Sequence, residues 1–175
     1  MRRAAVVLLA CLAGCGGGDK LSSAPPSAPR RLTVTSPDFP ANGAIPARFS
    51  CDGDKARPAL RFAGVPAGAA ELALIVVDPD AGGFVHWTVY GLPSDTRTLG
   101  ATGLPPGGRE GENSTGASGW TPPCPPSGTH RYEFRLYSLE RASGLDAGAK
   151  PDDVIAAVRK SAGGSGLLVG RYERR

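Results

Sequence analysis

Glycine and proline recur along the whole chain and limit its regular structure more than any other feature. The 175 residues include 25 glycines and 17 prolines, which is about twice the usual share of residues that interrupt helices and strands. Long helices are therefore not expected. Apolar residues make up 41% of the chain, enough to build a hydrophobic core, and the length favours one domain. No apolar run is long enough to span a bilayer as a helix.

Short runs of alternating or continuously apolar residues predict a mainly β structure. We expect half-buried strands at Arg31–Thr35 and Ala59–Phe62, and a fully buried strand at Glu71–Val77. One helix is expected to begin at Pro151, which suits a first-turn position, and to be stopped by Gly163 and Gly164. Its buried stripe should comprise Val154, Ile155, Val158 and Ala162, and residues 166–172 should form a last strand.

Two further strands should carry the histidines. Strict alternation from Phe84 would place His86 and Tyr90 on one face, with Val85 and Trp87 on the other. The same rule places His130, Tyr132, Phe134 and Leu136 on the face opposite Arg131, Glu133 and Arg135. Both histidines then fall on mixed or apolar faces, so each should point into a partly enclosed site. The segment 103–128 exceeds the usual loop length, which favours a functional role for it.

The N-terminus has the layout of a secretory signal: two arginines, an apolar stretch, and small residues before a cysteine. Leu12–Cys15, which reads LAGC, resembles the lipobox of bacterial lipoproteins, whose cysteine becomes the lipidated first residue. Residues 1–14 are therefore predicted to be a signal peptide, Cys15 the lipidation site, and residues 15–30 a flexible linker. Gly16 after the cysteine favours the outer membrane, facing the periplasm of the bacterial cell envelope. A plain signal peptide is the alternative.

Removing the signal changes the charge and the cysteine count. The formal charge of +4 falls to +2 without Arg2 and Arg3, which excludes an electrostatic case for nucleic acid. Cys51 and Cys124 remain, and a pair in an exported domain predicts a disulfide. A nucleophile or a metal ligand is the alternative, but neither cysteine lies in a CxxC motif. No metal and no cofactor are expected.

The only two histidines of the chain lie in two short stretches that concentrate its chemistry. His86 follows Asp78 and Asp80 in VVDPDAGGFVHW, and His130 follows a proline-rich loop in PPCPPSGTHRY. Two imidazoles and two carboxylates at strand ends can bind phosphate or carboxylate through ring N–H donors. The alternative is that Asp78 caps a turn and that each histidine is a hydrogen-bonded core residue.

DPDAGGFVHW together with PPCPPSGTHRYEFRLYSL resembles the phosphatidylethanolamine-binding protein family, in particular its bacterial Raf kinase inhibitor-like branch. FSCDGDKARPAL and the terminal LVGRYER extend the similarity from about Leu32 to Arg174. The resemblance implies that residues 31–175 form an antiparallel β-sandwich with a short C-terminal helix, long Pro/Gly-rich loops and a small anion-binding pocket at one end. By motif, the implied ligand-binding residues are Asp78, Asp80, Phe84, His86, Pro125, Pro126, His130 and Tyr132.

The chain departs from the family pattern at Gly82, where a proline is usual, and at 120–123, where the pocket wall is altered. Family members bind phosphate-like head groups or acetate, and several act by occupying kinases, proteases or other partners. We therefore expect a lipid-anchored envelope protein, not an enzyme, that binds a small anionic ligand such as phosphate or a phospholipid head group. An inhibitory or modulatory effect on a partner protein is also implied.

A hydrolase is the alternative, in which His130 and Asp78 activate Cys124 or a water molecule. The chain lacks a G-x-S-x-G elbow, and its candidate thiol is expected to be oxidised, so this alternative is disfavoured. A purely structural role in the envelope is a third hypothesis.

Overall fold

The computed structural model of the protein describes residues 28–101 and 103–174. The predicted signal peptide, Cys15 and most of the predicted linker lie outside these residues. No helix in the described ranges is long and apolar enough to cross a membrane. The strands are β1 (Arg30–Arg31), β2 (Thr33–Thr35), β3 (Leu60–Ala63), β4 (Glu71–Asp78), β5 (Phe84–Leu92), β6 (Thr98–Leu99), β7 (Arg109–Glu110), β8 (Thr129–Leu139) and β9 (Ala162–Glu173). The helices are a 3-10 turn, η1 (Ala47–Phe49), and α1 (Pro151–Ser161).

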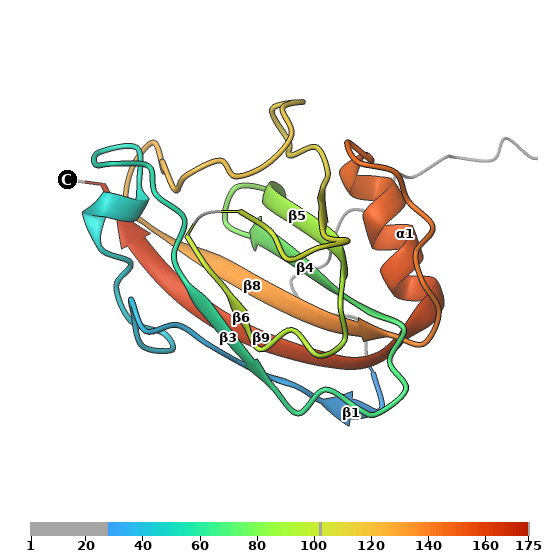
Figure 1. Cartoon of the computed structure of the whole chain (residues 1–175). Coiled ribbons are helices and arrows are strands. Elements are labelled where there is room, and N and C mark those ends of the chain that lie inside the picture. The colour runs from blue at the N-terminus through green and yellow to red at the C-terminus, as the bar shows by residue number, and fades with distance from the viewer. Residues whose placement is uncertain (1–27, 102, 175) are drawn as a thin grey trace, which may run out of the picture.

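The strands form two sheets that pack face to face (Figure 1). The larger sheet has the order β1-β9-β8-β4-β5-β7, and the smaller sheet has the order β2-β3-β6. The prediction of a mainly β fold with one short helix is confirmed. The pairs of long strands are antiparallel, as expected, but β1 runs parallel to β9. The larger sheet is therefore mixed rather than purely antiparallel.

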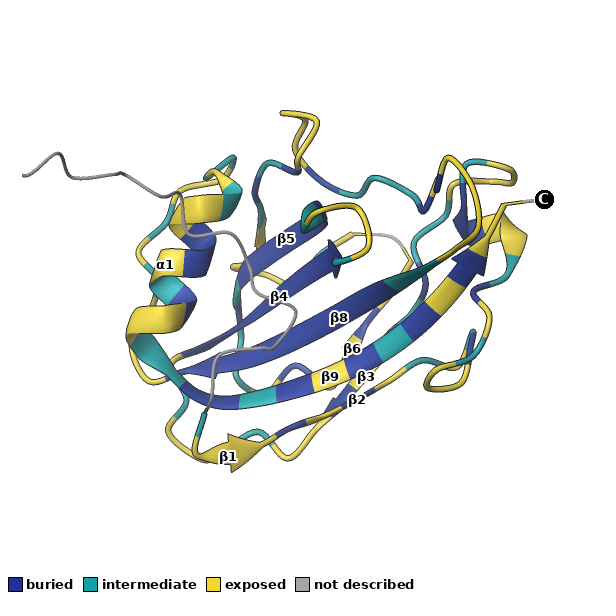
Figure 2. Ribbon diagram, turned by 180° about the vertical axis from the view of Figure 1, so that it is seen from behind, coloured by how far each residue is buried: buried dark blue, intermediate teal, exposed yellow. Residues whose placement is uncertain are grey.

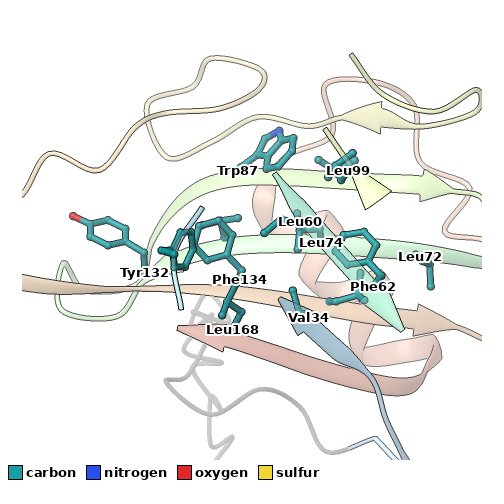
Figure 3. Packing of buried hydrophobic residues seen from close by; sticks show 14 of the residues in the cluster. Val34, Leu60, Phe62, Leu72, Leu74, Trp87, Leu99, Tyr132, Phe134 and Leu168 are labelled. Carbon is teal, nitrogen blue, oxygen red and sulfur yellow. The ribbon is translucent and has the colours of Figure 1, made fainter. Parts of the chain in front are cut away.

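The main core lies between the two sheets. Val34 and Phe62 of the smaller sheet meet Leu74, Trp87 and Phe134 of the larger sheet (Figure 3). A second buried cluster lies on the opposite face of the larger sheet, where α1 covers it. The apolar run of β4, residues 72–77, is consequently buried on both faces, and the whole strand is buried (Figure 2).

The junction of α1 and β9 differs from the sequence prediction. Helix α1 begins at Pro151 and buries Val154, Ile155 and Val158, as expected, but it ends at Ser161. Gly163 and Gly164 do not follow the helix as a stop signal; they are the second and third residues of β9. A Cβ atom at Gly164 would lie 2.7 Å from the Ser138 hydroxyl oxygen, so this strand needs glycine for its close approach to β8.

A disulfide joins Cys51 to Cys124, as predicted, across 73 residues of sequence. It links the loop after η1 to the proline-rich segment before β8. A backbone hydrogen bond from the Cys51 N–H to the Pro123 carbonyl, at 2.9 Å, supports the same junction.

Candidate functional site

A β-bulge in β5 sets the direction of His86. Val76 of β4 pairs with Trp87, but the next residue, Val77, pairs with Val85, so His86 is an extra residue in the ladder. Bulges of this kind redirect side chains and are common beside active sites. The strict alternation predicted for β5 is therefore wrong, since Val85 packs in the cluster beneath α1 whereas Trp87 packs between the sheets.

The His86 ring lies on aromatic neighbours and is nearly buried, with 5% exposure. Its centroid is 4.8 Å from that of Phe84 and 5.1 Å from that of Tyr132. The Nδ1 atom lies 2.8 Å from the Thr121 carbonyl oxygen, and because a carbonyl can only accept, Nδ1 carries the hydrogen. Burial lowers the pKa of His86 below its usual value, although the Thr121 hydrogen bond and the Asp78 charge oppose the shift.

Asp78 holds the second histidine. Its carboxylate Oδ2 lies 2.7 Å from the Nδ1 atom of His130, and its Oδ1 accepts hydrogen bonds from the backbone N–H groups of Asp80 and Ala81. The side chain of Asp78 is 3% exposed and that of His130 is 15% exposed. Asp78 therefore both shapes the β4–β5 turn and fixes the His130 tautomer with its hydrogen on Nδ1.

These side chains enclose one small cavity of about 130 Å³. The Nδ1 atom of each histidine is already bonded, which leaves the two Nε2 atoms for a ligand. The cavity brings together seven of the eight predicted ligand-binding residues with four that were not predicted as such. Its lining is Asp78, Ala81, Phe84, His86, Thr121, Pro122, Cys124, Pro125, Pro126, His130 and Tyr132.

Asp80 is the predicted residue that does not line the cavity. Its carboxylate accepts the Arg131 backbone N–H at 2.8 Å and the Arg131 guanidinium Nη2 at 2.6 Å. The guanidinium, as the largest cause, lowers the pKa of Asp80 to about 2. Asp80 thus fastens the β4–β5 turn to the start of β8, and Arg131, on the face opposite His130, had no sequence signal for this role.

Tyr132 contributes a buried hydroxyl to the cavity wall. The residue is fully buried, and its Oη atom has no hydrogen-bond partner among the described residues. Burial, followed by the Asp78 charge, raises the pKa of Tyr132 above its ordinary value, so the hydroxyl stays protonated. The protonated hydroxyl borders the cavity, where the nearby Asp78 carboxylate or a ligand oxygen can accept its hydrogen.

The segment 103–128 builds the remaining wall. Its Thr121 N–H donates to the His86 carbonyl at 2.9 Å, and Thr121 and Pro122 line the cavity. Behind them, Trp120 packs edge-on against Trp87, with centroids 6.0 Å apart, and stacks on Phe134 at an interplanar angle of 27°. The altered wall at 120–123 is therefore anchored in the main core. No group of three or more His, Cys, Asp or Glu suited to a metal ion occurs in the described part of the chain.

A mainly β fold of two packed sheets, with a compact Asp–His cavity at the strand ends, defines the class of protein. The family model for phosphatidylethanolamine-binding proteins matches residues 35–173. The chain belongs to this family.

Relatives and solved structures agree with this assignment. A UPF0098 protein of Methanothermobacter thermautotrophicus is 43% identical over 143 residues, which cover 78% of this chain and 95% of the relative. A Mycobacterium tuberculosis protein named as a candidate lipoprotein, LppC, is 39% identical over 97% of this chain and 94% of its own length. The crystal structure of the Chlamydia trachomatis family homologue CT736 superposes with a TM-score of 0.78 at 32% identity, covering 83% of this chain and 99% of that one. YbcL of E. coli, with a TM-score of 0.77 at 26% identity, covers 82% and 99%.

Proposed function

We propose that the cavity binds a small anion, the phosphate group of a dissolved compound or of a phospholipid head group, without chemical turnover. The observation that carries this proposal is the pair of histidines whose Nδ1 atoms are both held by acceptors, at 2.8 and 2.7 Å. The two Nε2 atoms and the Tyr132 hydroxyl are then available to contact a ligand in the same small cavity.

Protonation of the two histidines makes the cavity favourable for anion binding. Neutral His86 and His130 each offer a lone pair at Nε2, whereas the protonated rings offer N–H donors and positive charge. An anion therefore favours the N–H donor form of the rings when it binds.

The size of the cavity restricts the ligand. At about 30 Å³ for each water molecule, 130 Å³ holds about four waters, which suits a phosphate group with a short substituent. It does not hold an acyl chain. The name of the family model, which refers to phosphatidylethanolamine, is consistent with a phosphate group as the recognised part.

The second component of the proposal is the location of the domain. The LAGC motif at Leu12–Cys15 and the lipoprotein name of the M. tuberculosis relative support an envelope protein anchored through acylated Cys15, in the outer membrane of a cell that has one. Ligand-dependent inhibition or modulation of a partner protein is the corresponding biological role that we propose.

The Asp78–His130 pair could also serve as a general base for hydrolysis. Cys124, however, is bonded to Cys51 and so is not available as a thiolate nucleophile. Hydrolysis would therefore need a water molecule as the attacking group. We propose instead that the Asp78–His130 pair serves to bind the anion.

Calorimetric titration with inorganic phosphate and with phosphoethanolamine tests the proposal. We expect saturable binding that weakens by about 10- to 100-fold in His86→Ala and in His130→Ala, because each change removes a donor to a charged group worth about 1.5–3 kcal/mol. Arg61→Ala, which removes an exposed cation from the smaller sheet, is the matched control and should bind normally. Circular dichroism checks that the variants fold.

Unchanged affinity in both folded histidine variants would exclude the shared anion site. Phosphate released from phosphoethanolamine by the wild type, and lost in His130→Ala, would instead establish the hydrolase. Fatty-acid labelling that persists in Cys15→Ala would contradict the proposed anchor.

A further inference from the structure

Exposed cations gather at the end of the sandwich opposite the cavity. Arg30 and Arg31 form β1 and pair with Gly164 and Ser165, near the start of β9. Both arginines are exposed, and β1 lies at the same end of the molecule as the C-terminal end of α1 (Figure 1).

Two more exposed cations, Arg141 and Lys160, lie near the start of β9. The Arg141 N–H donates to the Ser161 hydroxyl at 2.8 Å, and its guanidinium reaches the Lys160 carbonyl. The acidic residue beside them is Glu140, which lines a small hollow together with Arg30. Arg30, Arg31, Arg141 and Lys160 thus share this end with the exposed Glu140 and the buried Glu71, although the whole chain carries a formal charge of only +4.

The edge of β9 adds an apolar side chain and a recess. The Leu32 N–H donates to the Ser165 carbonyl at 2.8 Å, and the next backbone hydrogen bond to this edge is from the Asn42 N–H to the Val169 carbonyl. Leu167 lies between these two contacts and is 43% exposed. An open hollow of about 590 Å³ lies there, lined by Arg30, Arg31 and Leu167 among others.

We propose that this basic end, defined as Arg30, Arg31, Arg141, Lys160 and Leu167, docks on a bilayer surface that contains anionic phospholipid. Guanidinium and ammonium groups pair with lipid phosphates, while an exposed leucine enters the interfacial layer. The hollow lined by residues of β1 and β9 gives a phosphate head group room beside two arginines.

The path of the chain supports the same partner. The segment that precedes the described residues joins the fold directly at β1. If Cys15 is acylated, which is part of the proposed function, only about 15 residues separate the anchor from Arg30, and a chain of that length reaches no further than about 50 Å. The anchor therefore holds the basic end, rather than the cavity, close to the lipid surface.

Vesicle sedimentation separates docking from anchoring. The protein is residues 15–175 with Cys15→Ser, which retains every described residue of the fold and cannot be acylated. It is mixed with vesicles of equal parts phosphatidylglycerol and phosphatidylcholine, or of phosphatidylcholine alone. We expect binding to the anionic vesicles that weakens as salt increases.

Each basic residue near an anionic surface contributes about 1 kcal/mol, or about fivefold in affinity. Arg30→Gln/Arg31→Gln should therefore bind about 25-fold more weakly, whereas Lys55→Gln/Arg109→Gln, with the same loss of charge elsewhere, should bind as the wild type does. His130→Ala should also bind vesicles normally, so failure of the anion site does not affect this test. Equal vesicle binding by the two double variants, or wild-type binding to nucleic acid but not to vesicles, would overturn the proposal.

Discussion

Removing the Cys51–Cys124 disulfide should lower both the free energy of unfolding and the affinity of the cavity for phosphate, and the two effects can be measured separately. The bond closes a loop of 73 residues. On the chain-entropy estimate, a loop of this length restricts the unfolded state by about 15 cal/mol/K, or about 4 kcal/mol at 25 °C. For a domain of this size, that corresponds to a melting temperature lower by about 10–15 °C.

Cys51→Ala/Cys124→Ala is the direct perturbation, and urea unfolding at equilibrium measures its effect. We expect phosphate affinity to fall as well, because Cys124 belongs to the wall of the cavity and the disulfide holds the adjoining prolines. Ile155→Ala is the control for a general loss of stability. It should cost a similar amount, about 2–5 kcal/mol, but it lies in the cluster beneath α1 and should leave phosphate affinity unchanged.

Two results would refute this reasoning. A loss of less than about 1 kcal/mol in the double variant would show that the unfolded chain does not gain the expected freedom. An equal loss of phosphate affinity in Ile155→Ala would show that the disulfide acts on binding only through overall stability.

Further variants test the site and the sheet. The pKa of His86 is lowered in the folded state, so below about pH 6.5 the unfolded state binds more protons than the folded state. As the pH is lowered, the free energy of unfolding should therefore decrease, whereas the affinity for phosphate should increase. Urea unfolding and calorimetry on His86→Gln should both show a smaller pH dependence than the wild type. Asp80→Asn should cost no more than about 1 kcal/mol, because the pair with Arg131 is partly exposed. In the wild type this stabilisation is present above about pH 4 and is lost as the pH falls through about 2. Measuring the free energy of unfolding of both proteins over this pH range tests the expectation. Gly170→Ala should destabilise by about 1–3 kcal/mol by thermal melting, since its Cβ would lie 2.6 Å from Ile45; an unchanged melting temperature would contradict this packing.

Periodicity and motif resemblance predicted much of the fold because they depend on local sequence. The apolar run of β4 specified a strand buried on both faces, and the export signal with only two remaining cysteines specified the disulfide. The glycine pair 163–164 was misassigned because it resembles a helix stop. Its need for glycine arises from Ser138, which is distant in sequence.

Most of the predicted residues line the cavity, but the geometry that brings them there was not predictable from the sequence. Strict alternation assumes a regular pleat, whereas the bulge at His86 depends on how Val76 and Val77 pair with β5. Asp80 resembled a ligand residue, but its partner Arg131 lies 51 positions away and on the charged face of β8. Contacts between distant segments decided both outcomes.

Strand β8 fixes how far the anion cavity can be from a membrane. It runs through eleven residues, from Thr129, next to the cavity residue His130, to Leu139 beside the basic end, and therefore spans about 35 Å at the usual rise. A domain docked through the basic end would hold its cavity several Debye lengths from the lipid, where the surface potential has decayed. Membrane docking and anion capture would then operate independently, and the captured group would come from the aqueous phase or an opposing surface rather than from the supporting leaflet.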